Sequence, residues 1–238
     1  MVSSVPNKEK LTLIAVFAHP DDEVGAIGTL IKHRDAGDDV YVILLTYGEN
    51  ASTFEGTKEE IKERRKEHVK RVEQLLDIKY KFLGLPDSAV FPSVDNAKKL
   101  ASMFKELKPD IIITWNQSVN LGIGHPDHRY TYNIVLDAIS YARYKNENDV
   151  YPPHRERISL YTTHHADTPI THATVFVDVT SQYKKILKFI DIYNEAYGGW
   201  NVKSFKLSMM ELTGRMCGVP YAERFTRLTW RRPQDYLD

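Results

Sequence analysis

The chain has 238 residues and a formal net charge of zero, because 32 basic residues balance 32 acidic ones. This balance gives no electrostatic basis for binding nucleic acid, and no apolar run reaches the roughly 18 residues of a membrane span. We therefore expect a soluble protein that has no membrane span and no nucleic acid as a partner. The length suits one α/β domain over residues 1–238. The single cysteine, Cys217, is typical of a reducing compartment such as the cytoplasm.

In the first half of the chain, apolar runs alternate with amphipathic helical patterns. Strands are expected over Leu11–Ala18, Asp39–Gly48, Lys79–Leu85 and Asp110–Asn116, and helices over 23–35, 57–76 and 96–107. Such alternation is typical of βαβ units, which build mostly parallel sheets. The sequence therefore predicts an α/β fold with a Rossmann-like, mostly parallel sheet and helices on both faces.

The second half is expected to add further helices and strands. Helices are predicted over Arg129–Arg143, Ser181–Tyr197 and Ser204–Gly218, strands over Ile158–Thr162 and Thr174–Val179, and loops over Asn146–Arg155 and Gly198–Asn201. The segment from Val202 to Phe225 offers apolar surface for a second copy of the chain. A homo-oligomer is therefore one expected assembly.

Charged residues crowd behind two of the predicted strands. The sequence HPDDE follows the first strand from His19, and GHPDH ends at His128 behind the fourth. In a parallel sheet with strand order 3-2-1-4, the ends of these two strands are neighbours where the order reverses, and ligands bind there. We therefore expect His125, Asp127 and His128 to face His19 and Asp22.

The residue types at this junction are those of a catalytic metal site. A catalytic zinc ion takes three imidazole or carboxylate ligands and keeps one position open, and His19, Asp22 and His128 fit that requirement. Two histidines and one carboxylate also suit Fe²⁺. Asp21 and His125 remain as a general base and as a donor to a developing oxyanion.

Each motif also has a purely structural interpretation. HPDDE could be a polar loop in which an aspartate caps the next helix, and acids such as Glu23 are favoured in a first helical turn by the helix dipole. GHPDH could be a surface turn. Because both motifs stand behind strands whose ends converge, we favour the metal site and assign only Glu23 to the helix start.

The motifs also carry a family resemblance. AHPDDE and the later HPDH resemble those of the LmbE-like, or PIG-L, family of zinc-dependent deacetylases. Further similar segments are LTYGE (45–49), RRKE (64–67), FLGLPD (82–87), VFVDVT (175–180) and GRMCGVPYAERF (214–225). The resemblance covers most of the chain. It implies removal of the acetyl group from an N-acetylglucosamine-containing small molecule.

The resemblance also implies roles for individual residues. The zinc ligands would be His19, Asp22 and His128. Asp21 would take a proton from the zinc-bound water as the water attacks the acetyl carbonyl, and His125 would stabilise the oxyanion. Asp127 would orient His125, a role that requires residues 125–128 to be non-helical because i and i+2 side chains diverge on a helix. Either Asp21 or His125 could protonate the leaving amine.

Substrate binding is less determined. The resemblance assigns a substrate hydroxyl or phosphate to Arg64, and Glu49 is expected to line the sugar pocket. Many family members have a His-x-Ser-Gln element late in the helix after DVT, where this chain has Ile192–Glu195. The departure leaves the acetylated substrate open. Trp115 is a candidate for stacking on a sugar or for core packing.

Three late histidines and two alternative functions stay open. His164, His165 and His172 lie near predicted strand ends, where they are candidates for the pocket or for the surface. The same site would also suit hydrolysis of another amide or an ester. A non-catalytic metal-binding or carbohydrate-binding relative is the remaining alternative, although Asp21 would add unpaired charge to a pure binding site.

Overall fold

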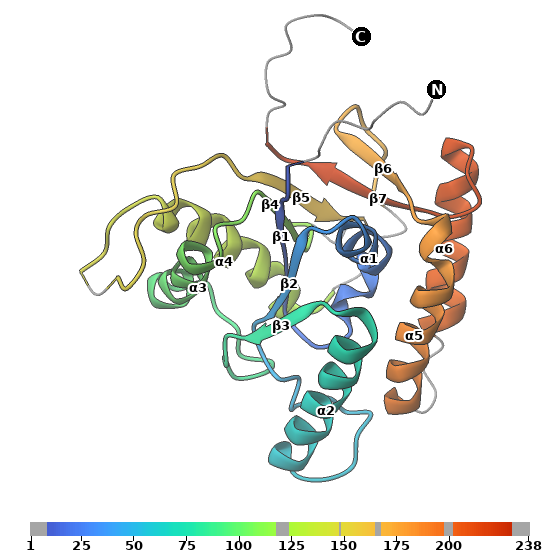
Figure 1. The fold of residues 1–238 in the computed structure, drawn as a ribbon. Helices are drawn as coiled ribbons and strands as arrows, with labels where there is room; N and C mark the ends of the chain where they lie inside the picture. The colour runs from blue at the N-terminus through green and yellow to red at the C-terminus, as the bar shows by residue number, and fades with distance from the viewer. Residues whose placement is uncertain (1–8, 118–123, 148, 165–167, 198–201, 230–238) are drawn as a thin grey trace, which may run out of the picture.

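The computed structural model describes residues 9–117, 124–147, 149–164, 168–197 and 202–229, and its strands form one sheet. The strands are β1 (Thr12–Phe17), β2 (Asp39–Leu44), β3 (Lys79–Phe82), β4 (Ile111–Thr114), β5 (Ser159–Thr163), β6 (Thr174–Asp178) and β7 (Ala222–Arg227). Their order is β3-β2-β1-β4-β5-β7-β6 (Figure 1). The first five strands in this order, from β3 to β5, are parallel to one another. The predicted mostly parallel sheet and the 3-2-1-4 order are confirmed.

Helices cover both faces of the sheet, as predicted (Figure 1). They are α1 (Ile27–Asp35), α2 (Lys58–Leu76), α3 (Val94–Leu107), α4 (Pro126–Ala142), α5 (Tyr183–Tyr197) and α6 (Val202–Cys217), with 3₁₀ turns η1 (Asp22–Gly25) and η2 (Thr180–Gln182). Successive side chains of β1 point to opposite faces of the sheet, so β1 contributes to the hydrophobic core on each face. Leu13 and Phe17 pack with residues of α1, α2, α5 and α6, whereas Ile14 and Val16 pack with residues of α3 and α4. The unbroken apolar run of β1 is therefore buried on both faces.

The structure differs from the sequence prediction at three elements. The expected helix from Glu23 is split, because η1 ends at Gly25 and α1 begins at Ile27. The helix expected from Arg129 begins at Pro126, with His125 as its N-cap and proline in the first turn, where its missing N–H costs nothing. Strand β7 was not predicted at all. Its sequence, AERFTR, lacks an apolar alternation because the buried positions include Glu223.

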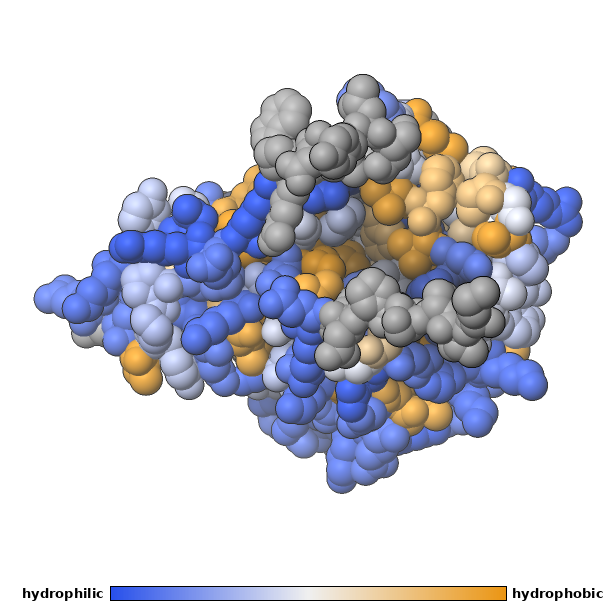
Figure 2. All heavy atoms as spheres, turned by 45° about the horizontal axis from the view of Figure 1, so that its top comes forward, coloured by the Kyte–Doolittle hydropathy of each residue, from blue (hydrophilic) through white to orange (hydrophobic). Residues whose placement is uncertain are grey.

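Charged side chains dominate the surface. On the face that includes the top of Figure 1, most of the surface is hydrophilic, and hydrophobic residues gather towards its middle (Figure 2). Among the described residues, no helix combines the length and apolar composition needed to cross a bilayer. The loop expected at Gly198–Asn201 lies outside the described residues, whereas Asn146–Arg155 contains no helix or strand in its described part.

Candidate active site

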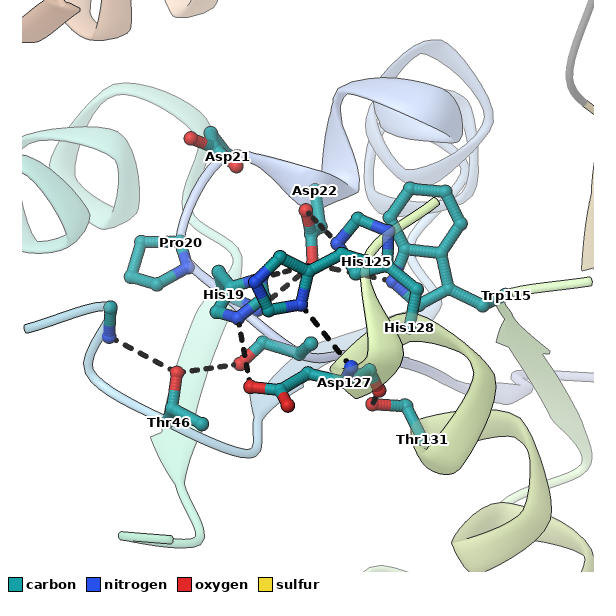
Figure 3. A network of polar contacts seen from close by, with 12 residues as sticks. His19, Pro20, Asp21, Asp22, Thr46, Trp115, His125, Asp127, His128 and Thr131 are labelled. Atoms are coloured by element: carbon teal, nitrogen blue, oxygen red, sulfur yellow. Dashed lines mark hydrogen bonds and ion pairs between the residues drawn. The ribbon is translucent and has the colours of Figure 1, made fainter. Parts of the chain in front are cut away.

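The two predicted motifs meet at one edge of the sheet. His19 follows β1, and His125 and His128 belong to the start of α4, beyond the neighbouring strand β4 (Figure 3). Ligand atoms of His19, His125 and His128 lie within 4.8 Å of one another. The reversal of strand order between β1 and β4 therefore brings together residues that are about a hundred positions apart in the sequence.

Asp22 lies between two of these histidines. Its Oδ1 is 3.3 Å from Nε2 of His128, and its Oδ2 is 3.4 Å from Nδ1 of His19. Ligand atoms around a tetrahedral zinc ion are separated by about 3.3 Å when each bond is about 2.0–2.1 Å long. Burial would raise the pKa of Asp22, but His128 and His19 lower it well below its usual value. The two contacts of Asp22 are near this spacing and join groups of opposite charge, and each contact uses a different oxygen of the Asp22 carboxylate.

The other nitrogen of His19 faces two more carboxylates. Nε2 is 3.2 Å from Oδ2 of Asp127 and 3.1 Å from Oδ1 of Asp87. Burial would lower the pKa of His19, but Asp22, Asp127 and Asp87 raise it to about 12. His19, Asp87 and Asp127 are themselves close enough to hold an ion. However, a carboxylate on one imidazole nitrogen is the usual support of a metal ligand and leaves Nδ1 directed at the ion.

Backbone groups fix both supporting carboxylates. The N–H of Ser88 donates to Oδ2 of Asp127 at 2.9 Å, and the N–H of Asn50 donates to Oδ2 of Asp87 at 2.8 Å. The loops after β2 and β3 therefore set the orientation of the His19 ring. A negative site built on a rigid frame favours a bound cation.

His125 is held by backbone and not by a carboxylate. The N–H of Asp127 donates to Nδ1 of His125 at 3.2 Å, and a neutral imidazole that accepts at Nδ1 carries its proton on Nε2. Burial and the nearby charge of His19 lower the pKa of His125. Asp127 therefore contacts His125 through its backbone N–H and not through the carboxylate that the sequence analysis expects, because His125 is the extended N-cap of α4 and Asp127 lies in its first turn. That carboxylate supports His19 instead.

Trp115 contacts two of the candidate ligands. Its Nε1–H donates to Oδ2 of Asp22 at 3.2 Å, and its ring stacks on His128 with centroids 4.0 Å apart at 14°. Oδ2 of Asp22 also accepts the backbone N–H of His19 at 2.8 Å, so Oδ1 is the oxygen directed at His128. Trp115 therefore orients Asp22 and His128, and the ring face that stacks on His128 is not open to a sugar.

Replacing Trp115 with Phe is expected to weaken zinc binding by about 10–100-fold, the usual effect of losing a group that orients a metal ligand. Phe can keep the stacking on His128 but cannot donate to Asp22. Competition with a chromophoric chelator would measure the zinc dissociation constant. Tyr141→Phe, in the cluster on the opposite face of the sheet, is the matched aromatic control and should leave zinc binding unchanged. Equal zinc affinities of the two variants would contradict this role for Trp115.

Asp21 lies beside the candidate ligands in a strained backbone conformation. Its φ is 99° and its ψ is −25°, a conformation that costs a residue other than glycine about 1–3 kcal/mol. Its Oδ2 is 3.5 Å from Nη2 of Arg65. Asp21, Arg65, His19, His125 and Asp87 line one pocket of about 270 Å³. This volume is at the small end of ligand pockets, and the polar lining suits a polar small molecule.

The arginine at this pocket is Arg65 and not the predicted Arg64. Ile61, Arg65 and Val69 are spaced by four residues and form the buried stripe of α2. Arg64 is exposed, and its guanidinium donates to the carbonyl of Glu55. A charged residue at an apolar position of the helical repeat was the signal in the sequence that identifies Arg65.

The remaining candidates have other contacts. Oε1 of Glu49 accepts the N–H of Asp87 at 2.9 Å, so Glu49 supports the Asp87 loop and is not among the residues that line the pocket. His164 contacts the hydroxyl of Thr226 on β7, and His172 is exposed. His165 lies outside the described residues.

Glu23 lies in the first turn of η1, in line with its predicted place at a helix start, and its side chain is fully buried. Its Oε2 accepts the N–H of Asp21 at 2.9 Å, and its Oε1 accepts the hydroxyls of Tyr80 and Tyr193 at 3.0 and 2.8 Å. Burial, followed by the charge of Asp21, raises the pKa of Glu23 to about 7. No spacing pattern in the sequence identifies these two tyrosines, which come from β3 and α5.

Two diacetylchitobiose deacetylases are similar to this chain, one in sequence and one in structure. Diacetylchitobiose deacetylase of Thermococcus kodakarensis is 26% identical over 230 residues, which cover 92% of this chain and 83% of that protein. The structure of N,N′-diacetylchitobiose deacetylase from Pyrococcus horikoshii matches with a TM-score of 0.80 at 23% identity, over 94% of this chain and 85% of that one.

A protein with a different reaction shares the fold. GalB, the 4-carboxy-2-hydroxymuconate hydratase from Pseudomonas putida KT2440, matches with a TM-score of 0.78 at 18% identity. The match covers 96% of this chain and 100% of GalB. At such identities, structural likeness shows the fold and leaves the reaction to the site residues.

The sequence model of the PIG-L family, described as GlcNAc-PI de-N-acetylase, matches residues 14–139, more than half of the chain. The chain therefore belongs to the PIG-L family.

Proposed function

We propose that this protein is a metal-dependent hydrolase that removes the acetyl group from an N-acetylglucosamine-containing small molecule. The observation that carries the proposal is the convergence of His19, Asp22 and His128 next to a pocket that is lined by His19, Asp21 and His125. Membership of the PIG-L family and the printed activity of the Thermococcus relative, a diacetylchitobiose deacetylase, support it.

In this proposal, His19, Asp22 and His128 hold Zn²⁺, with Fe²⁺ as the alternative that the same donor set admits. A metal held there would supply Lewis acidity, which would lower the pKa of the attacking water and polarise the acetyl carbonyl. Asp127 and Asp87 hold Nε2 of His19 and so direct Nδ1 at the metal. The chain thus provides both the ligands and the groups that fix their orientation.

Asp21 and His125 supply the acid–base chemistry. The Asp21 carboxylate faces the pocket beside His19 and accepts the proton of the attacking water. His125 keeps its proton on Nε2 because Nδ1 accepts the N–H of Asp127, so Nε2–H can donate to the oxyanion that forms on the acetyl carbonyl. Transfer of the Asp21 proton to the leaving amine would then release acetate and a free amino sugar.

Arg65 and Asp87 are the proposed contacts for the sugar hydroxyls, in place of Arg64 and Glu49. Replacing Arg65 with Lys is expected to lower kcat/KM by about 10–100-fold, because a charge-assisted hydrogen bond contributes about 1.5–3 kcal/mol and Lys lacks the planar fork. Arg64→Lys, one residue away on the exposed face of α2, is the matched control and should retain kcat/KM within about twofold. Steady-state kinetics of both variants with one substrate would check this, and a larger loss in Arg64→Lys would return the role to Arg64.

The proposal is tested by acetate release from a panel of N-acetylglucosamine derivatives, including N,N′-diacetylchitobiose. Zinc-loaded protein, chelator-treated protein and protein reloaded with zinc or iron would be assayed side by side, with metal content measured by elemental analysis. Acetate release that is lost on chelation and restored by metal is the expected result. No release from any sugar by protein that holds metal would refute the deacetylase proposal.

A second candidate is hydrolysis of another amide or ester at the same site. It is favoured by the segment Ile192–Glu195, in which Tyr193 is turned to Glu23 and Glu195 pairs with Arg71 of α2 at 2.7 Å. This segment differs in sequence from the His-x-Ser-Gln element of many family members, and in this chain two of its side chains contact Glu23 and Arg71. A panel of N-acyl and O-acyl compounds would distinguish this candidate from sugar deacetylation.

We also propose a cytoplasmic location and a homo-oligomeric state. The single cysteine suits a reducing compartment. Phe205, Leu212 and Met216 are exposed along one face of α6 and offer apolar surface for a second copy. Light scattering coupled to size-exclusion chromatography would measure the oligomeric state, and a monomer at micromolar concentration would refute that part.

A further inference from the structure

Glu23 is a buried acid whose carboxylate joins three separate elements. It lies in η1, and its Oε2 accepts the backbone N–H of Asp21. Its Oε1 accepts two hydroxyl groups, from Tyr80 of β3 and Tyr193 of α5. The side chain is completely shielded from solvent and therefore depends on these donors. Glu23 is neither a proposed metal ligand nor a proposed acid–base group, so the proposed mechanism gives no reason for this set of hydrogen bonds.

The hydroxyl of Tyr193 is held in place by packing. The side chain is 2% exposed, and its ring meets the edges of Phe189, at 5.1 Å between centroids, and His68, at 6.5 Å. Two residues further along α5, Glu195 pairs with Arg71 of α2. Contacts on both sides of Tyr193 thus fix its ring, and the hydroxyl can reach Glu23 without losing much rotamer freedom.

The residue that Glu23 holds is the one with the unusual backbone. Asp77 and Lys108 also have positive φ, but their values of 55° and 51° are those of ordinary left-handed residues that end helices. Asp21 has a φ of 99°, outside that well, and its amide donates to a carboxylate that water does not reach. Without this acceptor, rotation of the Asp21 peptide would relieve the strain and turn the side chain away from the pocket.

We propose that Glu23, fixed by Tyr80 and Tyr193, is a positioning residue that holds the Asp21 peptide so that the Asp21 carboxylate faces the pocket. The inference rests on the proposed function, which makes Asp21 the general base. Asp22, the next residue, is held independently by the N–H of His19 and by Trp115. Loss of the Glu23 contacts should therefore affect the base more than the metal site.

The test is Tyr193→Phe, which removes one hydroxyl and keeps the packed ring. We expect kcat for acetate release to fall about tenfold, because a hydrogen bond to a carboxylate is lost, while KM and the zinc dissociation constant stay within about twofold. Tyr183→Phe is the matched control, because Tyr183 begins the same helix and stacks on Tyr221. It should change none of these quantities. Glu23→Gln should lower kcat further if thermal unfolding shows that it folds.

Two additional measurements separate the possible failures. In the Asp21→Asn background, Tyr193→Phe should cause no further loss of kcat, because Tyr193 acts through Asp21. A crystal structure of zinc-loaded Tyr193→Phe should show the φ of Asp21 displaced from its wild-type value, a readout that needs no substrate.

An unchanged kcat and an unchanged Asp21 φ in Tyr193→Phe, with Asp21→Asn inactive, would overturn the positioning role alone. A loss confined to zinc affinity or KM would also overturn it. Full activity of Asp21→Asn would overturn the assignment of the base, and the positioning role with it.

Discussion

Replacement of Asp21 by Asn is expected to lower kcat for acetate release by about 10²–10⁴-fold, the usual contribution of a general base. Asn has nearly the shape of Asp but cannot accept the proton of the attacking water. Because His19, Asp22 and His128 are unchanged, zinc content measured by elemental analysis should remain that of the wild type. Acetate release and zinc content, measured on the same preparation, would check both parts.

Asp77→Asn is the matched control for this substitution. Asp77 is also an aspartate with positive φ, but it ends α2 and pairs with Arg34 on the surface. Its variant should retain kcat within about twofold, since surface pairs contribute little. If Asp21→Asn kept a rate comparable to that of Asp77→Asn, Asp21 would not be the base. A loss of zinc from Asp21→Asn would instead assign Asp21 to the metal site.

Replacement of Glu223 by Gln is expected to lower the free energy of unfolding by about 3–5 kcal/mol, the cost of leaving a buried charge without its partner. Glu223 is 3% exposed, and its Oε1 forms an ion pair with Nζ of Lys206 at 2.6 Å. It also accepts the backbone N–H groups of Gly28 and Thr29, at 2.9 and 2.8 Å, which are otherwise without intrahelical partners at the start of α1. Gln would leave Lys206 charged and buried.

Urea denaturation followed by circular dichroism would measure this change. Glu211→Gln is the matched control, because Glu211 pairs with Arg215 on the exposed face of α6, the helix that carries Lys206. It should cost at most about 1 kcal/mol. A difference of less than about 1 kcal/mol between the two variants would contradict the structural role of the Lys206–Glu223 pair.

The position of the site followed from strand order. The apolar runs of β1 and β4 predicted buried parallel strands, and the rule that ligands bind where the order reverses brought HPDDE and GHPDH together. The same reasoning could not predict β7. Its burial depends on Glu223, whose charge is balanced by Lys206 of α6 and by α1, and such a long-range pairing leaves no periodic pattern in the sequence.

Single side chains were predicted less well than their surroundings. Arg64 was chosen by resemblance, whereas the helical repeat of Ile61 and Val69 puts Arg65 on the buried face. The role expected for Asp127 depended on where α4 begins, and helix boundaries are the least certain part of a sequence-based prediction. Once α4 includes Asp127, its carboxylate turns to His19, and the backbone takes over the support of His125.

The wide sequence separation within the site has a consequence for how the protein matures. His19 and Asp127 contact each other across 108 residues, so their approach closes a loop that includes three strands of the sheet. Closing such a loop carries a large entropic cost and gives the site a high contact order. A zinc finger, with ligands close in sequence, can use metal binding to drive folding. With His19, Asp22 and His128 as the proposed ligands, the complete ligand set forms only after β1 and β4 have paired, so metal loading would follow folding.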